Sequence, residues 1–382
     1  MTGSIPQSPL DALIEREFGQ QEVAYFNHAA VGPWARRTAV AVQSFADESA
    51  RLGATRYPQW LEVEAELRAR AARLVHAAPS EIAFLKNTSE GLSVVAHGFP
   101  WHPGDRIVVP AEEFPSNRIV WESLASQGVR VHAVSLTDVP DPEDALLQAL
   151  DRNTRLLSVS SVQYARGLRL DLERLGKHCH THGIAFCVDA IQGLGCVAHD
   201  VARCRVDFLV ADAHKWLLGP EGIALFYCSE AWRDRLTLRQ FGWRMTAQPE
   251  RFDAPDWTPA ASSRRFECGS PNMLGIHALD ASLSLFEEIG IAEIATRLGA
   301  RVAWLMAVLA QLPGRVLTPD APERRAGIVS WQPQRNPADL YAALLGERCV
   351  CAVRAGALRF SPHFYTPWAD LERLCALLRT LA

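Results

Sequence analysis

A lysine lies on a connection between two apolar runs of the sequence. The runs 208–211 and 223–227 are predicted to be short buried strands, and Lys215 follows the first of them, just after Asp212 and His214. A lysine in this position is costly to desolvate, so it is exposed, paired or functional. Burial would lower the pKa of its amine, and a neutral amine condenses with an aldehyde as a Schiff base. A surface lysine on a loop is the simpler alternative.

An acid follows another apolar run. Residues 185–188 are predicted to be a buried strand, Asp189 comes directly after it, and Gln192 follows three residues later. Asp189 could simply cap the next turn. Paired with a pyridinium nitrogen, however, a buried carboxylate keeps pyridoxal 5′-phosphate an effective electron sink. Asp189 and Lys215 at two strand ends, 26 residues apart, together predict a site for this cofactor.

A helix start rich in hydrogen-bond donors follows the predicted strand 82–85. Asn87 and Glu90 have the spacing of a capping box, so a helix is expected to begin here. The free backbone N–H groups of such a start, with the hydroxyls of Thr88 and Ser89, form a natural seat for a phosphate group. An ordinary N-cap is the alternative.

Aromatic and basic side chains follow other predicted strands. Phe114 comes after strand 106–110 and brings a ring near the site, unless it belongs to the core. Arg354 is expected on a loop, and Arg359 within a strand of apolar neighbours. A partly buried arginine requires an anion, which a substrate carboxylate would supply through two hydrogen bonds. An internal salt bridge is an equal alternative for Arg359.

The elements that must position these residues alternate between strand and helix patterns. Helical patterns lie between the strands, at 116–126, 142–150 and 171–181, and strands are predicted at 106–110, 129–134, 156–162, 185–188, 208–211 and 223–227. The alternation predicts an α/β fold with a mostly parallel sheet, in which ligands bind beyond the carboxyl ends of the strands. A long irregular stretch, 240–267, is expected to be an active-site loop.

Composition narrows the class of protein. The 382 residues are 48% hydrophobic and 21% charged with a net charge of −4, which is ordinary for a globular protein and does not suggest nucleic-acid binding. No apolar run reaches transmembrane length, and the N-terminus lacks the pattern of a signal peptide. Nine cysteines, mostly within apolar runs, fit a reducing cytoplasm.

Two other motifs are given less weight. Gly193-Leu194-Gly195 lacks the third glycine of a dinucleotide fingerprint and follows the acid rather than the first strand. His178 and His182 would share a helix face with the look of a metal cluster, but no second ligand group at zinc spacing accompanies them. We therefore expect no metal site.

Taken together, these residues resemble those of the class V aminotransferase family, on the fold-type I scaffold that binds pyridoxal 5′-phosphate. The group includes cysteine desulfurases, kynureninases and isopenicillin N epimerase-like enzymes. The resemblance implies a large α/β domain at 31–268, a smaller α+β domain at 269–382, and an N-terminal segment, 1–30, that packs with the small domain. It also implies roles for a set of cofactor-binding residues: Thr88, Ser89, Glu90, Phe114, Asp189, Gln192, Asp212, His214, Lys215 and Ser270.

Within that set the resemblance assigns catalysis to Lys215, Asp189 and His214. Ser270, in the turn Gly269-Ser270-Pro271-Asn272, is similar to a residue that reaches the phosphate of the other subunit, which implies a homodimer. The implied substrate-binding residues are Asn27, His28, Tyr164, Arg354 and Arg359.

The chain also departs from the desulfurase pattern. Asp212 stands where desulfurases usually have Ser or Thr, and an acid near a phosphate dianion needs a compensating donor. Cys349 and Cys351 lie in an apolar run, whereas a persulfide-forming thiol belongs on an exposed loop. Both cysteines are therefore expected in the core, which disfavours a cysteine desulfurase.

The predicted reaction begins with an amino acid whose carboxylate is held by Arg359 and whose Cα proton is taken by Lys215. The resemblance favours a lyase of the C–S β-elimination type or an aminotransferase. An amino-acid epimerase is the alternative within the same chemistry. A cofactor-binding module without turnover and a nicotinamide oxidoreductase are the alternatives from other classes.

Overall fold

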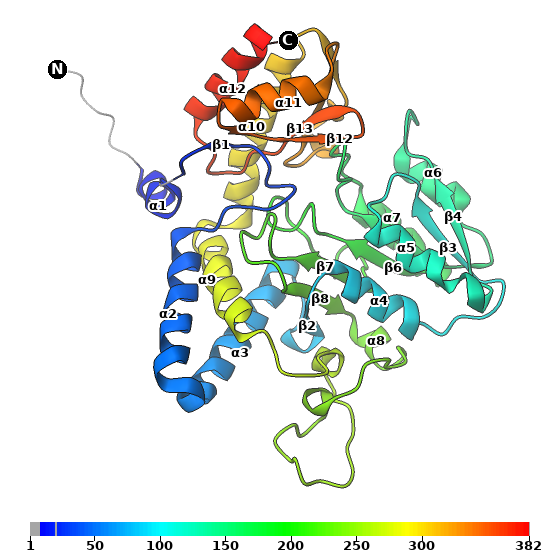
Figure 1. The fold of residues 1–382 in the computed structure, drawn as a ribbon. Helices are drawn as coiled ribbons and strands as arrows, with labels where there is room; N and C mark the ends of the chain where they lie inside the picture. Colours follow the sequence, from blue (N-terminus) through cyan, green and yellow to red (C-terminus); the bar gives the residue numbers. More distant parts are fainter. Residues whose placement is uncertain (1–7, 20, 382) are drawn as a thin grey trace.

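A mostly parallel β-sheet forms the centre of the protein, in a computed structural model that describes residues 8–19 and 21–381 (Figure 1). Within these residues the sheet has seven strands in the order β2-β8-β7-β6-β5-β3-β4. Strand β8 runs antiparallel to both of its neighbours, β2 and β7, and the other pairs are parallel. The strands are β2 (Ile82–Leu85), β3 (Arg106–Pro110), β4 (Arg130–Val134), β5 (Thr154–Ser160), β6 (Ala185–Asp189), β7 (Phe208–Asp212) and β8 (Ala224–Cys228).

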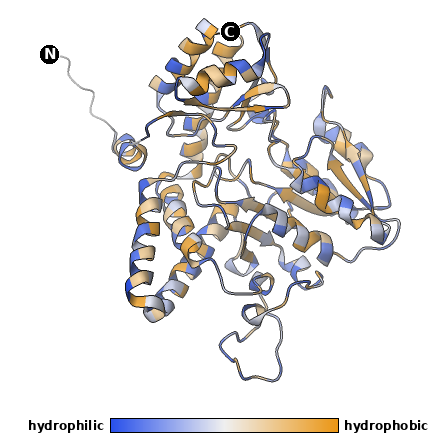
Figure 2. Ribbon diagram, viewed as in Figure 1, coloured by the Kyte–Doolittle hydropathy of each residue, from blue (hydrophilic) through white to orange (hydrophobic). Residues whose placement is uncertain are grey.

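Helices cover both faces of this sheet. Alternate residues of a strand face opposite sides, so that in β6 Phe186 and Val188 join one hydrophobic cluster while Ala185 and Cys187 join the other. Figure 2 shows the result, hydrophobic strands in the centre and helices with mixed surfaces around them. The connecting helices are α4 (Thr88–Gly98), α5 (Ser116–Glu122), α6 (Pro142–Ala149) and α7 (Leu172–His182). The predicted α/β fold is confirmed.

A helical layer lies at the β2 edge of the sheet. Helix α2 (Arg36–Leu52) and helix α3 (Tyr57–Val75) are separated by a 3-10 turn, which begins at Gly53 with a positive φ of 55°. Helix α9 (Met273–Ile289) packs against both of them. Apolar residues recur on one helical face from residue 36 to about residue 76 with a break near residues 53–58, and the 3-10 turn lies at that break.

The C-terminal part of the chain forms a smaller antiparallel sheet flanked by helices. Among the described residues its strand order is β12-β13-β10-β9. Its strands are β9 (Gly314–Val316), β10 (Val329–Pro333), β12 (Ala352–Arg354) and β13 (Ala357–Phe360), and the helices beside them are α10 (Ile291–Leu309), α11 (Pro337–Gly346) and α12 (Trp368–Leu381).

The N-terminal segment lies against these C-terminal elements. Strand β1 (Ala24–Tyr25) pairs in parallel with β11 (Cys349–Val350), and a further bridge joins Asn27 to Ser361. The segment before it forms helix α1 (Pro9–Phe18), with Ser8 as N-cap. Figure 1 shows this segment running between the C-terminal elements and the top of α2.

The stretch after β8 projects from the molecule. It contains only short helical pieces, α8 (Glu230–Arg233), η4 (Trp243–Met245) and η5 (Ser263–Phe266), and extends away from the sheet (Figure 1). The aromatic side chains exposed on it are Phe241, Trp243, Phe252 and Trp257.

Three chemical features accompany this fold. In the described part of the chain, no helix has both the length and the apolar character needed to cross a bilayer. All nine cysteines, which fall within that part, are free thiols. No cluster of three metal-ligating side chains occurs among residues 8–19 and 21–381.

Candidate active site

Polar residues end three neighbouring parallel strands of the sheet. Ser160 is the last residue of β5, Asp189 the last of β6 and Asp212 the last of β7, and Ser160 and Asp189 are register partners. Because the carboxyl ends of parallel strands lie at one edge of the sheet, these side chains gather there. Lys215 follows three residues after Asp212 on the same edge.

Lys215 is buried on the turn that follows β7. Its residue is only 9% exposed, and its Nζ lies 5.6 Å from the centre of the Phe114 ring. The N-terminal segment closes over this turn, since the Gly32 N–H donates to the His214 carbonyl at 2.6 Å. A Cβ on Gly32 would lie 2.4 Å from the Lys215 carbonyl oxygen, so only glycine fits this approach.

Burial lowers the pKa of Lys215 to about 8. Asp189 and Asp212 oppose this shift of the lysine pKa, whereas the positive charges of Arg359 and Arg354 add to it. A substantial fraction of the amine is therefore neutral near physiological pH, and a neutral amine is the form that acts as nucleophile or base.

Asp189 is a buried carboxylate that faces this lysine. It is 2% exposed and its Oδ1 accepts the Ile191 N–H at 3.0 Å. Burial raises the pKa of Asp189 to about 6, against the opposing effects of that hydrogen bond and of Lys215. A carboxylate in this state gains from a cationic partner such as a protonated ring nitrogen.

Asp212 joins the lysine turn to the start of helix α4. Its Oδ1 accepts both the backbone N–H and the hydroxyl of Thr88, the hydroxyl at 3.0 Å, and its Oδ2 lies 3.4 Å from His214 Nδ1. Burial raises the pKa of Asp212 to about 6, and burial followed by the Lys215 charge lowers the pKa of His214 to about 4. Three of the residues predicted to bind the cofactor thus contact one another.

The capping of helix α4 differs in detail from the predicted capping box. Asn87 accepts the Glu90 N–H at 2.9 Å as predicted, but the Glu90 carboxylate accepts the Lys86 N–H at 2.7 Å rather than that of Asn87. The Glu90 side chain therefore binds the backbone one residue before the N-cap. The Ser89 hydroxyl donates to Ser116 at 2.8 Å, on the exposed side of that start.

Phe114 lies beside the lysine turn and not in the core. It is 42% exposed, and its ring meets that of Tyr164 edge to face, with 5.3 Å between the ring centres. Together with the contact to Lys215, this places one face of an aromatic ring above the lysine turn, where a flat cofactor ring can stack.

Arg359 is buried without an anionic partner. It lies in β13 as predicted, is 2% exposed, and donates through Nη1 to the Tyr164 carbonyl at 2.9 Å and through Nη2 to Asn27 Oδ1 at 3.5 Å. Its Nε has no hydrogen-bond partner, and no carboxylate among the described residues forms an ion pair with it. Burial and the neighbouring Arg354 lower the pKa of Arg359 to about 10.

Arg354 stands beside it on the other arm of a hairpin. It was expected on a loop but is the last residue of β12, exposed, and followed by a two-residue turn, Ala355-Gly356, with positive φ at both positions. Such a turn is typical of a tight hairpin. This hairpin holds Arg354 and Arg359 near Lys215, and their positive charges lower the pKa of the lysine.

Gln192 and His28 are held by partners that the sequence reasoning missed. The Gln192 amide donates to the Ala29 carbonyl at 3.0 Å and accepts the Trp216 Nε1–H at 2.9 Å. His28 is fully buried, with its two ring nitrogens engaged by the Ser361 carbonyl at 2.8 Å and the Tyr365 hydroxyl at 2.6 Å.

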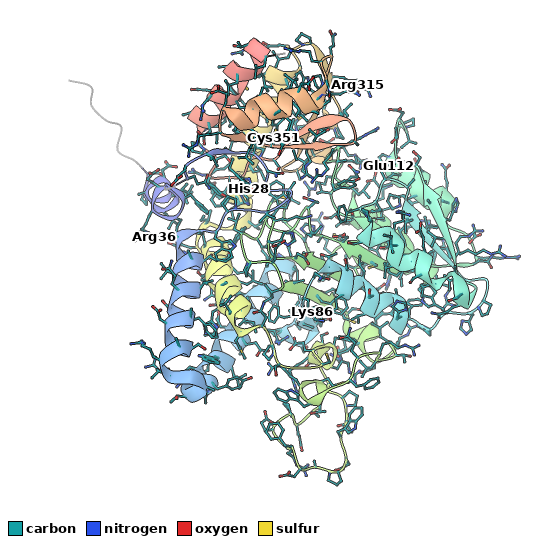
Figure 3. The ribbon with its side chains drawn as sticks, in the orientation of Figure 1. His28, Arg36, Lys86, Glu112, Arg315 and Cys351 are labelled. Atoms are coloured by element: carbon teal, nitrogen blue, oxygen red, sulfur yellow. The ribbon has the colours of Figure 1, made fainter. Side chains whose placement is uncertain are left out.

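Both residues therefore support the N-terminal segment above the lysine turn. In Figure 3, His28 lies between the C-terminal elements that contain Cys351 and the top of helix α2. A tryptophan directly after a lysine in a buried turn was the available sequence signal for Trp216, because a buried indole N–H needs an acceptor.

Glu113 is a further acid that received no role from the sequence. It is buried, and its carboxylate accepts the Ser160 N–H at 2.6 Å together with the Ser160 hydroxyl. Burial raises the pKa of Glu113 to about 7, and the negative charge of Asp189 acts in the same direction. The available sequence signal for Glu113 was its position next to Phe114, shortly after the end of strand β3.

Ser270 and two cysteines of the C-terminal part form no hydrogen bond with Lys215 among the described residues. Ser270 is exposed and lines a cavity of about 260 Å³ with Lys86 and Glu90. Cys349 and Cys351 are 1% and 2% exposed, and burial raises the pKa of Cys351 to about 12. The prediction that both cysteines belong to the core is confirmed.

These residues fit pyridoxal 5′-phosphate. An aromatic face at Phe114, a buried acid at Asp189 and a buried amine at Lys215 supply the stacking surface, the pyridinium partner and the aldehyde-reactive group that this cofactor needs. The orphaned Nε of Arg359 offers a donor for a carboxylate beside them. The fold and this combination of groups define a pyridoxal-phosphate-dependent enzyme.

Comparison with known proteins supports the same class of enzyme. The family model described as aminotransferase class-V matches residues 41–369, and the chain therefore belongs to the class V aminotransferase family. Pyridoxal 5′-phosphate is the cofactor, and the predicted family, enzyme class and cofactor are confirmed.

Two relatives are named as cysteine desulfurases. The chain is 30% identical over 339 residues to a probable cysteine desulfurase of Methanothermobacter thermautotrophicus, covering 83% of each chain. It is 30% identical over 302 residues to a cysteine desulfurase of Dickeya dadantii, covering 76% of this chain and 71% of that one.

Solved structures share the whole fold. The apo cysteine desulfurase of Thermococcus onnurineus NA1 matches with a TM-score of 0.87 and 25% identity, covering 99% of this chain and 98% of that one. A cystine C-S lyase in complex with cysteine persulfide matches with a TM-score of 0.88 and 24% identity, covering 94% of this chain and 98% of that one, which shows the likeness of fold.

Proposed function

We propose that the protein is a C–S lyase, which binds a sulfur-containing amino acid and breaks its Cβ–S bond by β-elimination. The observation that carries the proposal is Arg359, a buried guanidinium without a carboxylate partner beside an amine of lowered pKa. A buried unpaired cation is destabilising unless a ligand supplies the opposite charge. The carboxylate of an amino acid supplies it and places Cα near Lys215.

Each residue of the site has a role in this reaction. When bound, pyridoxal 5′-phosphate supplies an electron sink for the charge left at Cα. Lys215 in its neutral form takes the Cα proton, and Asp189 holds the proton on the ring nitrogen. Arg359 and Asn27 orient the carboxylate, and the exposed Arg354 adds positive charge beside Arg359.

The remaining residues hold the cofactor. Phe114 would stack on its ring, and the edge-to-face contact with Tyr164 holds Phe114 in place. Thr88 and Ser89 offer the donors of the α4 start to its phosphate, with His214 beside them. Gln192 is positioned by Trp216.

Elimination is favoured over persulfide formation on a protein thiol. A desulfurase of that kind needs a nucleophilic cysteine that reaches the substrate sulfur, and such a thiol is exposed and of low pKa. Cys349 and Cys351, the cysteines nearest in sequence to Arg359, are buried, and burial raises their pKa values. An elimination needs no such thiol, because the sulfur leaves with the electron pair of the Cβ–S bond while the pair left at Cα forms the new double bond.

The test is to separate the products of the two routes. The purified protein is first examined for the visible band of the lysine-bound cofactor and is then incubated with L-cystine, L-cysteine and S-alkyl cysteines. Elimination yields pyruvate and ammonia together with a sulfur product, whereas desulfuration yields alanine. We expect pyruvate. Alanine with a persulfidated protein would contradict the lyase assignment, and an exchanged Cα proton without bond cleavage would favour an epimerase.

We also propose that the protein works as a homodimer in the cytoplasm. Ser270 is exposed and lines a cavity with Glu90, which supports its contact with a second copy, and the exposed aromatic residues of segment 240–262 offer an apolar surface for that contact. Free thiols throughout support a reducing compartment. Light scattering of the purified protein tests the dimer.

A further inference from the structure

Asp212 occupies the hydrogen-bond donors that begin helix α4. Thr88 donates its backbone N–H and its hydroxyl to Oδ1 of this acid, the hydroxyl at 3.0 Å, and Thr88 is the first residue of the helix. A phosphate seated at a helix start uses the same donors. A carboxylate therefore lies where the phosphate of the cofactor has to bind.

The charges around Asp212 determine what happens when a dianion arrives. His214 faces its Oδ2 at 3.4 Å, and Lys215 is the cation that favours its ionised form. Two other acids, Glu221 and Asp189, interact unfavourably with its negative charge. Burial raises the pKa of Asp212 and lowers that of His214, so at neutral pH the pair carries about one negative charge.

We infer that binding of the cofactor phosphate takes up one proton at the Asp212–His214 pair. The inference rests on the proposed function, because it assumes that the phosphate of pyridoxal 5′-phosphate is seated on helix α4. The phosphate displaces the carboxylate from Thr88, and one solvent proton enters between Oδ2 of Asp212 and Nδ1 of His214. The dianion then faces either a neutral acid or an ion pair, and not a second free negative charge.

This uptake makes cofactor affinity depend on pH in a defined direction. Above about pH 6 the pair is unprotonated in the free protein, so each pH unit costs about a factor of ten in affinity through proton linkage. A serine or threonine at this position has no charge to neutralise. The chain therefore retains its cofactor best under mildly acidic conditions.

The experiment measures phosphate affinity, not activity. The full-length protein is stripped of cofactor, and the Kd of inorganic phosphate is measured by calorimetry between pH 6 and 8.5. Pyridoxal 5′-phosphate is then titrated by quenching of protein fluorescence. Asp212→Asn keeps an acceptor for Thr88 without the charge, and Asp212→Ser removes the occupant altogether. The charge-matched control is Glu221→Gln, which does not contact Thr88.

The expected result is a ratio of Kd values, wild type to Asp212→Asn, that grows about tenfold for each pH unit above 6. Using this ratio cancels the titration of phosphate itself. Calorimetry in two buffers of different ionisation enthalpy should count about one more proton taken up by the wild type than by Asp212→Asn.

A ratio that stays constant with pH would overturn the inference, and so would a Glu221→Gln variant that behaves like Asp212→Asn. Asp212→Ser guards against a fault specific to the Asn variant, since both must lose the pH dependence. Failure of the proposed function is a separate result, in which pyridoxal 5′-phosphate binds no variant at any pH, and the inorganic phosphate titration still decides the role of Asp212.

Discussion

Two groups of buried charges in this protein are arranged in opposite ways. Between α3, β2 and the end of the projecting stretch, Arg68 donates to Glu64 and Glu267, each at 2.7 Å, and Arg244 also binds Glu64. These four side chains are between 5% and 14% exposed. Each positive charge meets an acid, and each acid meets an arginine.

At the carboxyl edge of the sheet three buried charged residues do not pair with one another. Lys215, Asp189 and Arg359 are 9%, 2% and 2% exposed, and among the described residues none of them forms an ion pair. The pKa shifts of these three groups favour their neutral forms, because the pKa values of Lys215 and Arg359 are lowered and that of Asp189 is raised. The pKa of Arg68 is raised, which favours its charged form. Burial alone therefore does not distinguish a structural charge from a functional one, but the pairing does.

The largest effect is expected at the open site. Lys215→Ala should lower kcat/KM for the eliminated amino acid by about 10⁴-fold or more, because general-base catalysis alone contributes about 10²–10⁴ and cofactor attachment is lost as well. The melting temperature should not fall. Steady-state kinetics and thermal unfolding check this, with Lys177→Ala on the surface of α7 as control. Substantial residual turnover would remove Lys215 from the mechanism.

The closed group should respond in stability instead. In Glu64→Gln, Arg68 and Arg244 each lose one carboxylate partner. Removal of one partner of a buried ion pair costs about 3–5 kcal/mol. The free energy of unfolding, measured in denaturant, should fall by that amount, while kcat per folded molecule stays the same. Glu66→Gln, on the same helix but exposed, is the matched control. A loss below 1 kcal/mol would mean that the paired buried charges are not the structural ones.

Arg359→Met tests the unpaired guanidinium from the other side. The KM for the amino acid should rise by about 10²-fold, because truncating one partner of a buried charged contact typically costs 2–5 kcal/mol. Stability should be unchanged or increase, since a buried charge without a partner is removed. Arg315→Met, on the exposed strand β9 (Figure 3), should change neither quantity. A large loss of stability in Arg359→Met would mean that the arginine has a structural partner.

The smallest effect concerns pH. Lys215 has a pKa of about 8 in the folded protein and 10.5 as an ordinary lysine, so between these values the unfolded chain binds more protons. Stability of the cofactor-free protein should therefore rise with pH in this window, by up to about 1.4 kcal/mol per pH unit. Lys215→Met should lack this rise, and Glu64→Gln should keep it. Denaturant unfolding at pH 8 and 9.5 gives the comparison.

Much of the sheet could be predicted because its signal is local. Strands β2 and β3 begin and end at the predicted residues, since apolar runs bounded by Gly, Pro and Asp specify buried strands. The acid and the lysine at the ends of β6 and β7 followed from the same pattern. Helix α1 was missed, although Ser8, Pro9 and Asp11 form a typical helix start, because its apolar face is short.

The contacts that complete the site could not be predicted, because they join residues far apart in the chain. Thr88 and Asp212 are separated by 124 residues, and Arg359 and Asn27 by 332. Sequence spacing carries no information on such pairs unless a motif links them. It also could not decide between a substrate carboxylate and an internal salt bridge for Arg359, and the tertiary surroundings of its guanidinium favour the first.

The pairing of the N-terminal segment with the C-terminal elements also has a consequence for biosynthesis. His28 and its acceptor Ser361 are 333 residues apart, and ribosomes add about 5–20 residues per second. The strands that pair with the segment around Asn27 are therefore synthesised on the order of tens of seconds after it. During this time β1 has no partner strand, and in the later part of it the nascent chain contains Lys215 but not Arg359. The cofactor site can begin to form while the protein is being made, whereas the substrate site is completed only when β13 with Arg359 has been synthesised.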